Sequence, residues 1–485
     1  MEGRYDVIII GAGVIGCAVA RELSRYKLSV AVLEKDSDVA GGTSGRNSGV
    51  VHAGFNNRPG SLMARYCVEG NLEFEDLCRE LDVPYLRTGK LVTALDKDDL
   101  KGLEKLLDQG RKNGVPGLEI VGREDIKRME PEVEGIAALY SPVTAVINPF
   151  LLTVALAENA WANGVRFFFR TKVSSIQRHP DHFTVRAGRR SFRSSWVINC
   201  AGLYADRIAR MVGIDEYRIY PCRGEYYILD KRVSRHLKMP VYPVPKPTVG
   251  GLGVHLTPTV EGNILIGPSA EYIQSRDDYA TTEPVMKQLY KEARDLLPVI
   301  TEQDFIRNYS GIRPKLVGPK VGGFGDFITE DRQDVKGFIN LVGIESPGLT
   351  SAMPIARRVV ELLDQKERLE KRGDFEENRK GIIRFRELPE EEKKRLVEEN
   401  PDYGEVVCRC ETITKGEILE AIRNPLGVRT LSGIKYRARA MMGRCQGGYC
   451  LARIVEILTD EMGCRPEEIY ERGPESYMFA GRVRE

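Results

Sequence analysis

The chain has 485 residues and a formal net charge of +2, with 42% hydrophobic and 29% charged residues. This composition is that of a globular protein of two or three domains and excludes a disordered chain. The near-balanced charge gives no overall field that would favour nucleic acid or an anionic membrane surface, and no stretch approaches the roughly 18 apolar residues of a membrane-spanning helix.

The amino-terminus goes straight into a strand pattern, and its apolar run is too short for the central region of a signal peptide. Ten cysteines without an export signal indicate a reducing compartment. Clustered thiols in such a compartment bind metal or do redox work more often than they form disulfides. We therefore expect a cytoplasmic protein.

The first predicted elements form a strand–helix–strand unit. A β-branched run at residues 5–10 precedes a helical pattern at residues 14–26 and a second buried strand at residues 28–35. This order predicts a parallel sheet with helices packed on it.

Three glycines, Gly11, Gly13 and Gly16, occupy the turn between the first strand and the helix in the spacing G-x-G-x-x-G. The first permits a tight turn, the second lets the backbone approach a pyrophosphate, and the third lets helix and strand pack closely. Glu34 ends the second strand 23 residues after Gly11, where its carboxylate can accept hydrogen bonds from a ribose. We interpret the unit as a dinucleotide site for FAD or NAD rather than a chance glycine turn.

A loop-like stretch at residues 36–57 follows, and further along the chain residues 148–165 predict a helix. Asn148 is its expected cap, Pro149 its first position and Gly164 its stop.

The second half of the chain predicts a different kind of sheet. Alternating apolar residues broken by Pro and Gly indicate antiparallel strands over residues 220–267. A charge-dense segment at residues 364–400 is interpreted as a solvated linker with short helices, with a docking surface as the alternative. The remaining predicted elements are helices at residues 60–81 and 98–113 and strand–turn–helix units at residues 196–213 and 337–363.

Two of these later turns favour a tightly held FAD over NAD. Ala201 and Gly202 allow close approach to a nucleotide, and Asp206 lies on the first turn of the following helix. Residues 348–350 would direct the amino-terminus of another helix at an electron-rich group, such as the pyrimidine side of a reduced flavin. Each turn alone is equally compatible with packing, and their joint presence in this order favours FAD.

The motifs of the first 370 residues or so resemble the glycine-oxidase/D-amino-acid-oxidase superfamily of flavoproteins. Within it, "RNSGVVHAGFNNRPGSLMARYCVEGN", "GKLVTA", "CAGLYADRI", "CRGEYYIL" and "YPVP…GLGVHLTP…GNILIGPSAE" are similar to L-2-hydroxyglutarate dehydrogenases. The stretch "YSGIRP" is similar to FAD-dependent glycerol-3-phosphate dehydrogenases.

The resemblance implies an α/β fold with a Rossmann-like FAD-binding domain interleaved with an antiparallel-sheet substrate domain. We expect an FAD-dependent oxidoreductase domain at residues 1–370, with FAD-binding parts at about 1–85, 145–215 and 335–370 and a substrate sheet at about 86–144 and 216–334. The expected cofactor-binding residues are Gly11, Gly13, Gly16, Glu34, Lys35, Thr43, Ser44, Arg46, Asn47, Ser48, Val173, Ala201, Gly202, Gly348, Leu349 and Thr350.

Oxidation of a secondary alcohol by a flavin needs a base for the hydroxyl proton and a cation for an anionic substrate group. A base with a pKa near the working pH favours histidine, and His52 and His255 are the two histidines inside the family motifs. The alternatives are a structural His52 packed against the flavin and a His255 that faces solvent. Arg313 is expected to hold phosphate or carboxylate, since a guanidinium makes paired hydrogen bonds to either. Lesser candidates, for most of which an ordinary surface charge is the alternative, are Lys90, Arg223, Lys246 and Lys315.

Four cysteines near the carboxy-terminus, Cys408, Cys410, Cys445 and Cys450, form a C-x-C pair, a gap of 34 residues and a C-x4-C pair. All five histidines precede residue 256, so a metal here would take mainly sulfur ligands, which suit zinc or an iron–sulfur cluster. Four buried thiols without metal are the alternative. A capping box beginning at Thr414 starts a helix after the first pair, and a second helix opens at the second pair. Helix amino-termini lower thiol pKa values and so favour ligation.

This layout resembles the bacterioferritin-associated-ferredoxin-like [2Fe–2S] domain that is appended to related dehydrogenases. The stretches "GIKYRARAMMG" and "RCQGGYC" carry the resemblance, whereas the C-x4-C spacing departs from the C-x2-C of the stand-alone ferredoxin. The resemblance implies a [2Fe–2S] cluster on the four cysteines, in a domain at residues 405–485 behind a charged linker at residues 371–404. The other cysteines have no ligand spacing and are expected to be core thiols: Cys17, Cys67, Cys78, Cys200, Cys222 and Cys464.

Together these patterns predict an FAD-dependent dehydrogenase that converts sn-glycerol 3-phosphate to dihydroxyacetone phosphate. L-2-hydroxyglutarate oxidation is the alternative, supported by the motifs around His52 and His255, and an amino-acid dehydrogenase is a third. A flavin takes two electrons whereas the cluster passes one at a time, so we expect redox partner subunits, through which a peripheral membrane association could arise. A redox-sensing or assembly subunit with structural FAD and zinc is the hypothesis from another class. No nucleic-acid partner is expected.

Overall fold

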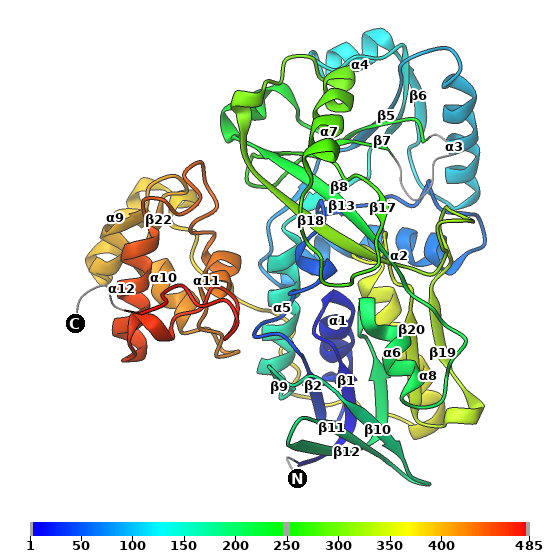
Figure 1. Ribbon diagram of the computed structural model, residues 1–485. Helices are drawn as coiled ribbons and strands as arrows, with labels where there is room; N and C mark the ends of the chain where they lie inside the picture. The colour runs from blue at the N-terminus through cyan, green and yellow to red at the C-terminus, as the bar shows by residue number, and fades with distance from the viewer. Residues whose placement is uncertain (1–2, 246–252, 482–485) are drawn as a thin grey trace.

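The computed structural model describes residues 3–245 and 253–481. The larger, amino-terminal part of the chain is built around two sheets (Figure 1). The first sheet is parallel at its centre, where β12 (Arg190–Asn199), β1 (Gly3–Ile10), β2 (Val30–Leu33) and β9 (Arg166–Phe168) lie side by side. Val7 pairs with Trp196 on one side and Val30 on the other. The sheet is completed by β10 (Ser175–Arg178), β11 (Phe183–Ala187), β19 (Ile328–Asp331) and β20 (Phe338–Val342).

Three helices pack together against this sheet: α1 (Val14–Leu23), α5 (Pro149–Ala162) and α8 (Ala352–Glu367). The strand–helix–strand prediction is confirmed, although α1 ends at Leu23 rather than near residue 26. The Asn148 side chain accepts a hydrogen bond from the Leu151 N–H, Pro149 is the first helical residue, and Gly164 has a φ of +91° beyond the end of α5.

The second sheet holds the predicted antiparallel strands and forms the upper part of the molecule in Figure 1. Among the described residues, its pairings are antiparallel except that of β14 with β5. In sheet order its strands are β17 (Glu271–Tyr272), β13 (Tyr220–Leu229), β16 (Ile264–Ile266), β15 (Leu256–Pro258), β14 (Val241–Pro243), β5 (Lys90–Ala94), β7 (Ala137–Ser141) and β6 (Glu119–Gly122), with β18 (Phe305–Lys315) on β13.

Smaller elements surround the two sheets. β19 pairs with β20, so the stretch 216–334 expected for the substrate sheet also supplies one strand of the first sheet. A three-stranded sheet is made by β3 (Val50–Val51), β8 (Ala145–Ile147) and β4 (Tyr85–Arg87). The helices on this side are α2 (Leu62–Glu80), α3 (Leu100–Lys112), α4 (Arg123–Met129), α6 (Ala205–Arg210) and α7 (Glu283–Leu296).

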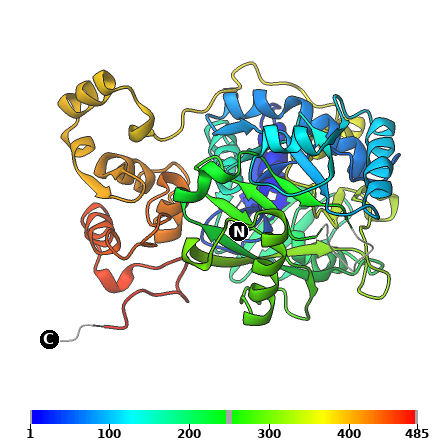
Figure 2. The same ribbon diagram turned by 90° about the horizontal axis from the view of Figure 1, so that it is seen from above.

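The charged segment after α8 is bound to the first sheet's helices rather than free in solvent. Phe375 lies under the Arg25 guanidinium at 4.3 Å, and Arg379 donates to Glu158 of α5 at 2.8 Å. Figure 2 shows this segment crossing from the main body to the short helix α9 (Glu390–Glu399). The predicted short helix is therefore present, but the stretch before it is held by specific contacts.

The carboxy-terminal residues form a small helical unit with a core of its own, separate from the two sheets (Figure 1). The Thr414 hydroxyl accepts from the Glu417 N–H and the Glu417 carboxylate accepts from the Thr414 N–H, which confirms the capping box. Its elements are β21 (Val406–Cys408), β22 (Ile413–Thr414), α10 (Lys415–Ile422), α11 (Leu431–Ala438) and α12 (Leu451–Met462). Over the described residues, none of the helices has both the length and the apolar character needed to cross a membrane.

Candidate cofactor and substrate sites

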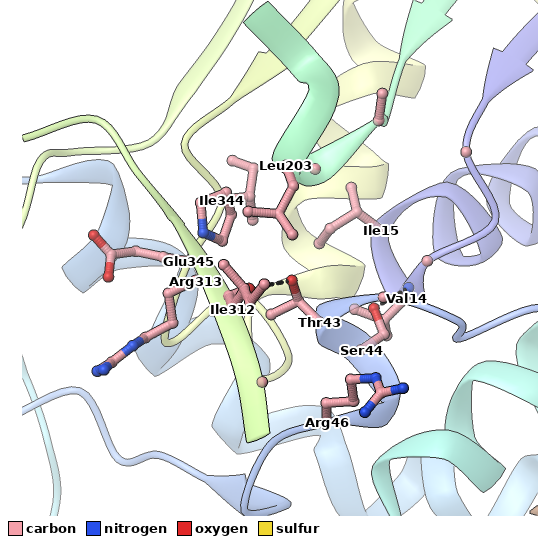
Figure 3. A pocket seen from close by; sticks show the side chains of 18 of the residues that line it. Val14, Ile15, Thr43, Ser44, Arg46, Leu203, Ile312, Arg313, Ile344 and Glu345 are labelled. Atoms are coloured by element: carbon pink, nitrogen blue, oxygen red, sulfur yellow. Dashed lines mark hydrogen bonds between the residues drawn. The ribbon is translucent and has the colours of Figure 1, made fainter. Parts of the chain in front are cut away.

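A cavity of about 520 Å³ runs from the β1–α1 turn to the strands of the second sheet (Figure 3). It collects residues that are far apart in the chain, from the turn at Gly11, the end of β2, the loop at residues 41–48, β13, β18 and residues 344–349. A single hollow that joins both sheets is the kind of place where a large ligand spans two domains.

The amino-terminal end of the cavity has the shape of a pyrophosphate cradle. Gly11 has a φ of +103°, and a Cβ there would lie 2.7 Å from the Cys200 carbonyl oxygen. A Cβ on Gly16 would collide with the Gly11 carbonyl oxygen, so this glycine lets α1 pack against β1. Gly13 caps α1 without a side chain, and the Ser44 hydroxyl accepts from the Val14 N–H at 2.9 Å. The amino-terminus of α1 thus lies at the cavity, with Gly13, Val14 and Ile15 in its wall, which is the place where a helix favours a phosphate.

Glu34 lies at the end of β2 beside this cradle. Its carboxylate accepts from the Ala12 N–H at 2.6 Å and from the Asp36 N–H at 2.9 Å, and it lines the cavity. Burial raises the pKa of Glu34 to about 6. Lys35 and Val173 also line this end, with the Lys35 ammonium 3.0 Å from Asp36.

The loop after β2 closes the middle of the cavity against β18. The Thr43 hydroxyl donates to the Ile312 carbonyl at 2.6 Å, which is the dashed contact in Figure 3. The Arg46 guanidinium lies 4.1 Å from the Tyr279 ring, and Asn47 donates to the carbonyls of Thr43 and Ser44. Thr43, Ser44, Arg46, Asn47 and Ser48 all line the cavity.

Two further turns complete the wall. Ala201, Gly202, Gly348 and Leu349 line the cavity, and Gly202 has a φ of +51°. Among the expected cofactor residues, Gly16 and Thr350 are the two that do not line it. Gly16 acts through helix–strand packing, and the Thr350 hydroxyl accepts from the His52 N–H at 2.9 Å.

His52, His255 and Arg313 all line the same cavity at its far end. The His52 Nε2 lies 3.4 Å from the Ser346 hydroxyl, and His255 stacks on Tyr242 with ring centroids 3.7 Å apart. Burial, with help from Lys90, lowers the pKa of His52 to about 3 and that of His255 well below its usual range. Both imidazoles are therefore neutral near pH 7, the form that can accept a proton, but neither has the pKa near the working pH that is expected of the base from the sequence.

Arg313 extends from β18 into this end of the cavity (Figure 3). Its Nη2 donates to the Ser269 carbonyl at 2.7 Å, which fixes the direction of the guanidinium. The neighbouring Lys315 is fully buried and bonded to Glu345 at 2.9 Å. A fixed guanidinium is suited to a planar or tetrahedral anion.

The lesser cation candidates differ from one another. Arg223 contacts Glu271 at 2.7 Å and Asp278 at 2.9 Å, and Lys315 is paired with Glu345, so these two have anionic partners already. Lys90 is buried with its ammonium 3.3 Å from the Tyr242 ring centroid. Lys246 lies outside the described residues.

Some residues of the site are not predicted from the sequence. Ser346, beside His52, lies just before residues 348–350, for which the sequence predicts only a helix terminus. Tyr226 and Tyr242 line the cavity from the second sheet, and "CRGEYYIL" contains Tyr226. Aromatic and hydroxyl residues inside family motifs were the available signal.

The four carboxy-terminal cysteines come together as two pairs. A thiol–thiol hydrogen bond joins the buried Cys408 to the buried Cys450, and another joins the exposed Cys410 to the exposed Cys445. The bond from Cys450 lowers the pKa of Cys408 to about 6, and the Tyr449 N–H lowers the pKa of Cys445. In the described part of the chain no three histidine, cysteine or acidic side chains surround one point at metal-binding distance. Two sulfur pairs are what a two-iron cluster needs, since each iron takes two cysteines.

The other six cysteines are free thiols. Five are buried and Cys464 is half-buried. Their expected place in the core is thus confirmed for Cys17, Cys67, Cys78, Cys200 and Cys222.

The chain is similar to known proteins in both of its parts. Residues 6–362 match the FAD dependent oxidoreductase family, and residues 406–460 match the BFD-like [2Fe-2S] binding domain. A glycerol 3-phosphate dehydrogenase of Caloramator mitchellensis is 42% identical over 480 residues, covering 98% of each chain. The mitochondrial L-2-hydroxyglutarate dehydrogenase of Arabidopsis thaliana is 34% identical, covering 73% of this chain and 83% of that protein.

A solved structure is similar over the same region. The FAD-bound L-alpha-glycerophosphate oxidase of Mycoplasma pneumoniae has a TM-score of 0.73 and 30% identity, covering 78% of this chain and 99% of that one. The resemblance of the sequence to this flavoprotein group is confirmed, and a non-catalytic subunit with zinc is set aside. The chain belongs to the FAD-dependent oxidoreductase family, as an enzyme that binds FAD in its two-sheet part and a [2Fe–2S] cluster in its carboxy-terminal domain.

Proposed function

We propose that the protein is an FAD-dependent dehydrogenase of sn-glycerol 3-phosphate, with dihydroxyacetone phosphate as product. The observation that carries the proposal is the relative named glycerol 3-phosphate dehydrogenase, which is 42% identical over 98% of both chains. The glycerophosphate oxidase structure at 30% identity supports the same substrate class.

The residues at the far end of the cavity suit this reaction. Bound FAD supplies a two-electron acceptor for the hydride from the carbinol carbon. His52, neutral and beside the Ser346 hydroxyl, accepts the proton of the substrate hydroxyl, with His255 as the second candidate for this role. Arg313, held by Ser269, binds the phosphate. The cofactor roles of the glycine, loop and helix-terminus residues named above are part of the same proposal.

L-2-hydroxyglutarate is the second candidate substrate, because two relatives named for it are 31% and 34% identical, and the motifs around His52 and His255 resemble those of that group. These relatives cover only 73–74% of this chain. The glycerol 3-phosphate relative also covers the carboxy-terminal domain, so we rank that substrate first.

An anaerobic titration of the FAD-loaded protein separates the two substrates. We expect glycerol 3-phosphate to bleach the flavin absorbance at low concentration, and L-2-hydroxyglutarate or amino acids to leave it unchanged. Arg313→Met should raise the substrate concentration needed for half-maximal bleaching by about tenfold or more, since a charge-assisted hydrogen bond contributes about 1.5–3 kcal/mol. Bleaching by L-2-hydroxyglutarate alone would replace the first proposal by the second.

We further propose that electrons leave through the [2Fe–2S] domain to a redox partner subunit, in a cytoplasmic setting. The domain boundaries proposed above, 1–370, 371–404 and 405–485, are compatible with α8 ending at Glu367 and β21 beginning at Val406. Co-purification from the native source tests the partner: a lone polypeptide that reduces a soluble quinone would contradict it.

A further inference from the structure

Residues 406–481, called here the cluster domain, are seated on the oxidoreductase domain through a buried contact. Helix α11 lies against α5 (Figure 1). Tyr436 stacks on Phe150 of α5 with ring centroids 4.7 Å apart. Leu426 and Val428 are buried in the same apolar core as α1 and α5. The contact is thus continuous with the interior of the larger domain.

Arg437 is the polar centre of this contact. Its side chain is 1% exposed, and its guanidinium makes two hydrogen bonds with Asp38, at 2.7 and 3.1 Å. It also donates to Glu158 of α5 at 3.3 Å. Asp38 belongs to the loop that follows β2. Residues of this loop before and after Asp38, such as Asp36 and Gly41, line the cofactor cavity. A buried, forked guanidinium pair fixes orientation as well as proximity.

A second group of contacts joins the cluster domain to the second sheet. The carboxylate of Glu411, next to Cys410, accepts from Lys231 at 2.6 Å, and Arg439 donates to Asn263 at 2.8 Å. The residues on either side of Cys445 also cross the interface: Arg444 donates to Asp230 at 3.1 Å, and Gln446 accepts from Arg307 at 2.8 Å. Both cysteine-bearing loops are therefore tied directly to the oxidoreductase domain.

The linker adds a third tie. Arg379 shares the Glu158 carboxylate with Arg437, at 2.6 Å. The two domains and the segment between them thus meet at one buried carboxylate. An arrangement of this kind resists rotation of the cluster domain, because rotation would break the buried bonds of Arg437 to Asp38 and Glu158 and leave the guanidinium without those partners.

We propose that the cluster domain works in this seated position, and that Arg437 is the positioning residue that holds it there for electron transfer from flavin to cluster. The inference rests on the proposed electron export through the cluster. With FAD and the cluster bound, the seated domain would let the two electrons of the reduced flavin leave one at a time to a one-electron redox protein, and two protons would be released to solvent. No excursion of the domain is part of the cycle.

A reversible lock tests whether the domain has to move. A Cβ on Gly473 would lie 3.9 Å from the Ser37 Cβ, which is the spacing of a disulfide. Ser37→Cys with Gly473→Cys should form a disulfide across the interface in the FAD- and cluster-loaded protein. The flavin is reduced with light, and reduction of the cluster is then measured from the paramagnetic signal of the reduced cluster. We expect the rate to be the same with the disulfide closed as with the disulfide opened by a thiol. Slow transfer when closed, restored on opening, would overturn the proposal.

Arg437→Met tests the positioning residue, with Arg423→Met as the matched control. Arg423 is exposed in the same domain and pairs with Glu461. In the Arg437 variant we expect hydrogen exchange at residues 426–438 to rise by about tenfold or more, equivalent to 1.4 kcal/mol, and flavin-to-cluster transfer to slow. The control should change neither. If hydrogen exchange and flavin-to-cluster transfer were both unchanged in Arg437→Met, Arg437 would not be a positioning residue. If this variant does not fold, the disulfide experiment still tests whether the cluster domain works in the seated position.

Because the flavin is reduced by light and not by a substrate, these two tests do not depend on which substrate the enzyme oxidises. If glycerol 3-phosphate fails to bleach the flavin while both tests above succeed, the proposed substrate is wrong and the seated position stands.

Discussion

Lys90 is a single residue whose surroundings conflict with its charge. It is 1% exposed, and among the described residues its ammonium has no hydrogen-bond acceptor. Its closest named neighbours are the rings of Tyr242 at 3.3 Å and Phe55 at 5.1 Å. Burial lowers the pKa of Lys90 to about 7. Burying a charged group without an acceptor reduces the stability of the folded state, so a lysine kept at this position is expected to have a role in the site.

Replacing Lys90 by methionine should stabilise the FAD-loaded protein by about 1–3 kcal/mol at pH 7, because a buried group without an acceptor is removed. Below pH 7 the lysine is protonated in both states, so the gain is largest there. Between pH 7 and the ordinary value of 10.5 the folded state loses its proton first, so wild-type stability rises with pH and the gain shrinks.

Denaturant unfolding at several pH values measures this gain, with Lys112→Met as the control, since Lys112 is exposed and paired with Asp108. A Lys90 variant that is less stable at every pH, and that needs far more substrate to bleach the flavin, would instead identify Lys90 as an anion-binding residue.

His52 is the residue on which the proposed chemistry depends most directly. His52→Gln should slow flavin reduction by about 10²–10⁴-fold while FAD remains bound, the usual contribution of a positioned base. Because the pKa of His52 is lowered to about 3, its neutral form is present throughout pH 5–8, and the wild-type rate should show no acid limb from His52 in that range.

Rapid-mixing measurements at fixed pH test this expectation, with His179→Gln in the hairpin between β10 and β11 as the control. A larger loss in His255→Gln than in His52→Gln would transfer the role of base to His255.

At the scale of elements, the β1–α1 turn is where we expect the pyrophosphate of FAD to lie. Gly16→Ala should lower the FAD content of the purified protein strongly, since its Cβ would collide with the Gly11 carbonyl oxygen and push α1 away from β1. Gly122→Ala, which adds a Cβ with no neighbour within 4 Å, should leave FAD content unchanged. Flavin absorbance per protein measures both, and full occupancy in Gly16→Ala would show that the turn relaxes at little cost.

The elements that the sequence predicts well are those with local causes. The glycine spacing of the first turn, the Asn148 and Pro149 start of α5 and the Thr414 capping box each act within a few residues, and the structure confirms them. The antiparallel sheet could be predicted because alternation of apolar and polar residues is a local pattern, and the structure confirms it.

The parts that the sequence does not predict depend on contacts between distant segments. The contact of Ser346 with His52 joins residues 294 positions apart, and the Lys315–Glu345 pair is buried between a strand and a loop. The charge-dense linker gives no sign of its attachment, since Arg379 reads as an ordinary surface charge until Glu158 is brought beside it. Periodicity carries no information about such pairings.

At the scale of the whole molecule, the two cofactor sites lie in different parts of the chain. The FAD cavity is built from the two sheets, whereas one cysteine pair, Cys408 with Cys450, lies in the core of the small helical unit and the other pair is exposed on that unit. None of the four cluster cysteines lines the cavity. Loss of the cluster should therefore leave substrate oxidation at the flavin intact and remove only the exit of electrons.

Cys408→Ser tests this separation, because Cys408 is a buried member of one sulfur pair. We expect its iron and sulfide content to fall, while FAD content and the rate of flavin bleaching by glycerol 3-phosphate stay at the wild-type level. Reduction of a one-electron acceptor protein should fall with the iron content. Cys464→Ser is the matched control, since Cys464 is a half-buried thiol in the same unit outside both pairs. If flavin bleaching slows in step with iron loss in Cys408→Ser, the seated cluster domain is also needed to shape the flavin site, and the Asp38–Arg437 contact is the route by which it would do so.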